Sequence, residues 1–120
     1  MRKKIVAVLD DLIFTVKIGD AARRAGVQVE FVKTTEDALQ KAAKAWAMII
    51  DLNFAPMELI AKMKSGIETR SIPLIGYVSH VQTEVIRQAR ESGCDTVLAR
   101  SAFVQKLEEM MKDLASYHRL

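Results

Sequence analysis

Five short apolar runs alternate along the chain with segments of helical periodicity, and this alternation limits the possible folds more than any other feature. Runs of this length, bounded by polar or turn-forming residues, are typical of β-strands. Four of them are apolar almost throughout, as expected for strands covered on both faces of a parallel sheet. The runs cover residues 5–9, 27–32, 47–50, 73–78 and 96–99.

The segments between these runs repeat apolar residues three to four positions apart, which is the spacing of one helix face. Glycines at positions 26, 66 and 93 lie where helices commonly end. The predicted helices cover residues 12–25, 35–43, 57–63, 84–90 and 103–114. We therefore expect a single α/β doubly wound (βα)5 domain over residues 1–120, with a flavodoxin-like five-stranded parallel sheet in the order 2-1-3-4-5 and no output domain. The run at 27–32 alternates with polar residues, so it belongs at an edge.

Composition excludes several classes of protein. The chain has 120 residues, half of them hydrophobic, which suits one folded domain. No apolar run approaches the roughly 20 residues that cross a bilayer, and the lone Cys94 fits a reducing compartment. We expect a cytoplasmic protein, monomeric or weakly dimeric, without membrane contact. His118 near the end should be exposed.

Positive charge is modest and scattered. The net charge is +3, and the aromatic residues are one Trp, two Tyr and four Phe. Nucleic-acid binders concentrate basic residues on one face and often add aromatic platforms. We therefore expect no direct contact with nucleic acid.

Polar residues follow four of the five predicted strands at the edge where their carboxyl ends meet. Asp10 and Asp11 follow the first strand, and Asp51 and Asn53 end the third, which is its neighbour in the expected order. Ser79 and His80 follow the fourth, and Arg100 and Ser101 follow the fifth. Three converging carboxylates repel one another unless a cation joins them. A hard ion such as Mg²⁺, which prefers oxygen ligands, would suit them and would favour phosphoryl transfer to a carboxylate.

At this point the sequence resembles the receiver domain of two-component response regulators, the CheY-like fold. The resemblance covers nearly the whole chain and rests on VLDDLIF, MIIDLN, YVSH and the strand and helix rhythm. It implies that Asp51 accepts a phosphoryl group from a histidine kinase or phosphotransfer protein, and that Ser79 is a switch hydroxyl. It implies a Mg²⁺ site made of Asp10, Asp11, Asp51 and the backbone carbonyl of Asn53.

The chain departs from the family pattern at three places. Arg100 stands where the family has Lys, and it is followed by Ser101 instead of Pro. The segment after Asp51, LNFAPMEL, is short and lacks the usual Gly. Counted from Pro73, the hydroxyl of Ser79 comes one residue late. Unless a bulge absorbs that residue, Val78 takes the switch position.

Three functions remain open from the sequence. The first is a stand-alone phosphorylatable receiver that signals through protein contacts, and the second is a phosphorylation-independent interaction module of the same fold. The third is an enzyme or nucleotide-binding protein of similar topology. The third is the least favoured, because the chain has no GxGxxG or GxxxxGK[ST] motif to hold phosphates. We therefore expect signalling without enzymatic turnover. We interpret His80 as a polar loop residue.

Overall fold

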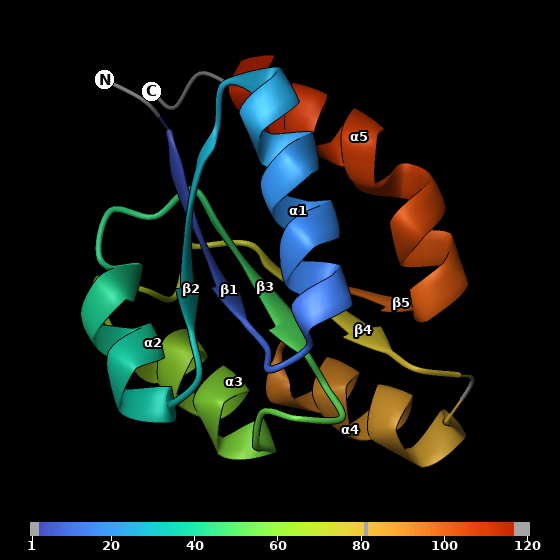
Figure 1. The fold of residues 1–120 in the computed structure, drawn as a ribbon. Helices are drawn as coiled ribbons and strands as arrows, with labels where there is room; N and C mark the ends of the chain where they lie inside the picture. The colour runs from blue at the N-terminus through green and yellow to red at the C-terminus, as the bar shows by residue number, and fades with distance from the viewer. Residues whose placement is uncertain (1–2, 81, 117–120) are drawn as a thin grey trace.

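Strand and helix alternate five times within residues 3–80 and 82–116, which are the residues that the computed structural model describes (Figure 1). His118 lies outside them. No helix in the described part of the chain is long and apolar enough to cross a membrane. The strands are β1 (Lys4–Val8), β2 (Gln28–Val32), β3 (Ala47–Asp51), β4 (Leu74–Val78) and β5 (Thr96–Ala99).

The five strands pair in parallel in the order β2-β1-β3-β4-β5, so the sequence-based prediction of the fold and of β2 as an edge strand is confirmed. Helix boundaries agree to within a few residues. The main difference is that the last helix begins directly after β5, without a loop. The helices are α1 (Leu12–Ala25), α2 (Thr35–Ala42), α3 (Met57–Ser65), α4 (Thr83–Ser92) and α5 (Arg100–Ser116).

The helices cover both faces of the sheet and create two apolar cores. α1 and α5 pack on one face, and α2, α3 and α4 on the other (Figure 1). Because side chains alternate along a strand, Ile49 faces α1 and α5 while Ile50 faces the opposite core. The same alternation directs Asp51, two residues after Ile49, toward the α1 and α5 side.

Two local features fix the start of α1 and the end of β3. Asp11 caps α1, because its Oδ1 accepts a hydrogen bond from the Phe14 backbone N–H at 3.1 Å. After β3, Leu52 packs against Gly76 of β4 so closely that a Cβ there would lie 2.7 Å from the Leu52 Cδ1 atom. Gly76 therefore lets the segment after Asp51 lie close to the sheet.

Candidate functional site

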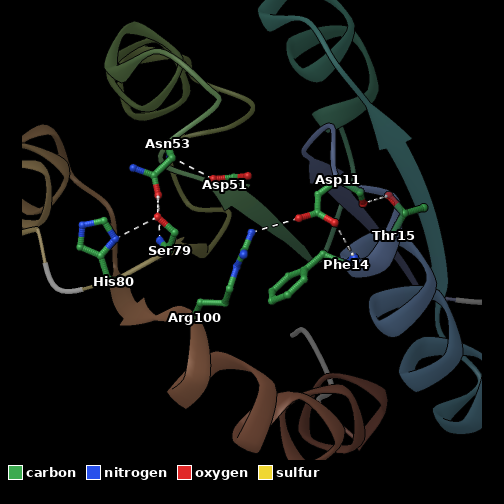
Figure 2. Close-up of polar contacts among 8 residues, drawn as sticks. All are labelled: Asp11, Phe14, Thr15, Asp51, Asn53, Ser79, His80 and Arg100. Atoms are coloured by element: carbon green, nitrogen blue, oxygen red, sulfur yellow. Dashed lines mark hydrogen bonds and ion pairs between the residues drawn. The ribbon is translucent and has the colours of Figure 1, made fainter.

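Asp11, Asp51 and Arg100 lie together at the carboxyl edge of the sheet, and we call them the Asp51 site. Asp11 comes from the turn before α1, Asp51 is the last residue of β3, and Arg100 is the first residue of α5. Figure 2 shows the Arg100 side chain extending toward Asp11, with Asp51 close by. Of the side chains predicted to converge at this edge, Asp11, Asp51 and Arg100 lie together, whereas the third acid, Asp10, does not join them.

Asp51 is a buried carboxylate, with only 8% of its surface exposed. Its Oδ1 accepts a hydrogen bond from the Asn53 backbone N–H at 3.0 Å, which holds the carboxylate at the strand end. Burial raises the pKa of the Asp51 carboxyl above its ordinary value, and the negative charge of Asp11 adds to the rise. The Asn53 hydrogen bond and the positive charge of Arg100 oppose it.

Arg100 forms an ion pair with Asp11. The Arg100 Nη2 atom donates to Asp11 Oδ2 at 3.0 Å, and the two side chains are 38% and 28% exposed. The guanidinium also lies over the Phe14 ring, 4.5 Å from its centroid, which is a cation–π contact. Because Asp11 Oδ1 already caps α1, both of its carboxylate oxygens have partners within the protein.

Asp10 points to a different partner. It is exposed, and its Oδ1 lies 3.2 Å from the Lys33 Nζ atom, at the end of the edge strand β2. Within residues 3–80 and 82–116, no three His, Cys, Asp or Glu side chains are arranged to hold a metal ion. The predicted metal-binding residues Asp10, Asp11, Asp51 and Asn53 therefore lie near the same edge, but the three acids do not gather around one point, because Asp10 turns toward Lys33. Their role stays a prediction.

Ser79 belongs to a separate polar network beside the site. Its backbone N–H and hydroxyl both donate to Asn53 Oδ1, at 2.7 and 3.0 Å, and Asn53 Nδ2 donates to Gln82 Oε1 at 2.8 Å (Figure 2 shows all but Gln82). His80 is exposed, and its Nδ1 lies 3.4 Å from the Ser79 hydroxyl. The network ties the segment after β3 to the segment after β4.

The bulge that would move Ser79 back by one position is not present in β4. The register from Leu74 to Tyr77 against β3 is continuous, and so is the register from Ile75 to Val78 against β5. Val78, fully buried, therefore ends the strand, and Ser79 follows it. The predicted role of Ser79 as a switch hydroxyl remains untested.

An aromatic cluster beneath the site was missed by the sequence analysis. The Tyr77 ring stacks on Phe14 and on Phe103, with centroids 5.1 and 4.7 Å apart. Tyr77 pairs with Asp51 in the sheet, and its hydroxyl is buried with no hydrogen-bond partner among the described residues. The available signal was the position of Phe14 on the same helical face as Ile18, which marks it as facing the sheet.

The comparisons with known proteins agree with this architecture. No protein-family model matches the sequence, and no curated protein matches it either. A response regulator from Hahella chejuensis superimposes with a TM-score of 0.83 at 18% identity, over 98% of each chain.

Two further similar structures are of a phosphorylated and of a metal-bound response regulator. The phosphorylated cyanobacterial phytochrome response regulator RcpA gives a TM-score of 0.77 at 20% identity, over 95% of this chain and 91% of that one. The Mn²⁺-bound form of response regulator Rcp1 gives 0.74 at 15% identity, over 96% and 93%. Likenesses at these identities establish the fold, and over nearly its whole length the chain has the fold of response regulator receiver domains.

Proposed function

We propose that the chain is a receiver-type signalling domain of the cytoplasm, with the Asp51 site as its input and protein contacts as its output. The observation that carries the proposal is the meeting of Asp11, Asp51 and Arg100 at the carboxyl edge of a sheet with this topology. That edge is where ligands bind in doubly wound folds. The partners would be a histidine kinase or phosphotransfer protein and a target protein.

Asp51 is the candidate phosphoryl acceptor. In the proposed reaction a carboxylate oxygen of Asp51 attacks phosphorus, the bond from phosphorus to the donor breaks, and the donor leaves with its electron pair. The Asn53 N–H holds Oδ1 of the carboxylate, and the positive charge of Arg100 lies close enough to affect its pKa. RcpA, which shares the fold, has been observed as a phosphorylated protein.

Exposed apolar residues adjoin the site on the first turns of α1. Leu12, Ile13 and Val16 are 80%, 67% and 54% exposed, and Leu12 directly follows Asp11. Apolar groups gathered on a surface are commonly protein contacts. We propose this surface as the place where the phosphoryl donor docks, because a protein bound there would reach Asp51.

A phosphorylation-independent interaction module is the second candidate. Two observations favour it: Arg100 already neutralises Asp11, and the buried Val78 ends β4 without offering a hydroxyl. In this case the fold would present a fixed binding surface, and no phosphoryl group would be needed.

Labelling by a small phosphodonor separates the two candidates. The protein is incubated with Mg²⁺ and acetyl phosphate, and its intact mass is measured. The proposal predicts the gain of one phosphoryl group that is lost in Asp51→Asn and kept in Asp20→Asn, a matched change at an exposed aspartate of α1. If the chain gains no mass under conditions that label a known receiver, phosphoryl acceptance is wrong and the interaction module remains.

A further inference from the structure

Arg100 makes contacts of two kinds at the Asp51 site. Its Nη2 atom donates to Asp11 Oδ2 at 3.0 Å, and its guanidinium carbon lies 4.5 Å from the centroid of the Phe14 ring. Its charge also reaches Asp51, where it opposes the rise of the carboxyl pKa. One side chain from α5 therefore supplies positive charge to two acids from β3 and the turn before α1.

The ring under Arg100 is buried and packed against other rings. Phe14 is only 5% exposed and stacks on Tyr77, which in turn stacks on Phe103 of α5. A flat guanidinium can lie on such a ring and still direct an N–H toward a carboxylate, whereas the compact ammonium of lysine has no flat face to stack. The position thus makes specific use of arginine.

We propose that Arg100 is a built-in counter-cation that competes with divalent metal ions for the Asp11 carboxylate. The reason is geometric: Asp11 Oδ1 caps α1, Oδ2 accepts from Arg100, and a metal ion at this carboxylate would lie beside the guanidinium charge. The inference rests on the proposed function in one respect, which is that the Asp51 site is the input of the domain. It assigns to that site a resting state in which the charge of Asp11 is balanced by Arg100 without metal.

The pairing of Arg100 is incomplete, so displacement is feasible. The Arg100 Nε atom is buried and has no hydrogen-bond partner among the described residues. A buried donor without a partner is unfavourable. The hydrogen bonds of the guanidinium are therefore incomplete, and a competing cation needs to replace only the Asp11 ion pair and the cation–π contact with Phe14.

Metal binding to variants of the full chain tests the inference. Free Mn²⁺, which takes oxygen ligands, is measured by its electron paramagnetic resonance signal during titration of the wild-type protein and of Arg100→Ala. Arg100→Ala should bind Mn²⁺ about two- to fivefold more tightly, which corresponds to the loss of one partly exposed ion-pair competitor. Arg24→Ala is the matched control, because it removes the same charge from an exposed pair with Glu108, and it should bind like the wild type.

Two further variants make the result decisive. Asp11→Asn combined with Arg100→Ala should lose the gain in affinity, whereas a gain that persists would overturn the assignment of Asp11. Arg100→Lys keeps the charge but loses the flat guanidinium, so its Mn²⁺ affinity should lie between those of the wild type and Arg100→Ala. It replaces Arg100→Ala if circular dichroism shows that the alanine variant is not folded.

Equal Mn²⁺ affinity in wild type and in the Arg100 variants would overturn the inference. Its failure is separate from failure of the proposed function. If acetyl phosphate does not label the protein, the proposal that Asp51 accepts a phosphoryl group is wrong, but the Mn²⁺ measurements still test the role of Arg100. If Asp51 is labelled but the variants bind Mn²⁺ as the wild type does, only the proposal that Arg100 competes with metal is wrong.

Discussion

The interior of the sheet and its carboxyl edge are stabilised in opposite ways. In the interior, apolar residues of successive strands fill two cores, and each residue contributes through burial. At the edge, the carboxyl of Asp51 is buried, and apart from the Asn53 N–H the groups that act on it, Asp11 and Arg100, come from segments far away in the sequence. The stability of this domain therefore comes from the interior, while the edge is less stable and carries the candidate chemical site.

Truncation in the interior should have the largest effect. Phe103→Ala removes a fully buried ring that stacks on Tyr77 and should lower the free energy of unfolding by about 3–5 kcal/mol. Urea unfolding followed by the fluorescence of the single tryptophan, Trp46, measures it. Val104→Ala, next to it on the exposed side of α5, should change stability by less than about 0.5 kcal/mol. Similar losses in both variants would show that the aromatic cluster is not a core.

Neutralising the buried acid Asp51 should raise the free energy of unfolding, whereas truncation in the interior lowers it. Because burial raises the pKa of folded Asp51, the unfolded chain binds fewer protons than the folded chain between the two pKa values, and stability falls as pH rises through that interval. Once Asp51 is ionised in the folded chain, its charge therefore lowers the free energy of unfolding. Asp51→Asn, which keeps an oxygen for the Asn53 N–H, should raise the free energy of unfolding by about 0.5–2 kcal/mol.

The gain from Asp51→Asn should disappear at acidic pH, where the wild-type carboxyl is protonated. Urea unfolding at several pH values measures this dependence. Asp20→Asn, at an exposed acid paired with Arg23, controls for the general loss of a negative charge and should show no such gain. A destabilising Asp51→Asn at neutral pH would mean that the edge contributes stability as the interior does.

The same contrast explains what the sequence could predict. Local apolar patterning predicts strands such as that at residues 47–50, which the structure extends by one residue to Asp51, and the alternation of β2 with polar residues predicts its edge position. The meeting of Asp11 and Asp51 followed from the order of strands, because parallel strands end at the same edge. These are consequences of short-range patterns combined with a few topological rules.

The pairing of side chains at the edge could not be predicted in this way. Arg100 and Asp11 are 89 residues apart, and their contact depends on α5 beginning directly at Arg100 and on the ring of Phe14 beneath the guanidinium. The side chain of Asn53 accepts a hydrogen bond from the Ser79 hydroxyl, a contact that no sequence pattern predicted. Such partners are chosen by rotamers and packing, which no residue pattern specifies.

The most direct test of the Asp51 site is the coupling energy between Arg100 and Asp11, measured by a double-mutant cycle. Asn at position 11 keeps the cap of α1, and Gln at position 100 keeps an extended side chain without the charge, so Asp11→Asn, Arg100→Gln and the double variant isolate the ion pair. For a pair that is partly exposed, urea unfolding without divalent metal should give a favourable coupling of about 0.5–1 kcal/mol. A coupling of zero, or one of opposite sign, would contradict the account that Arg100 balances the charge of Asp11.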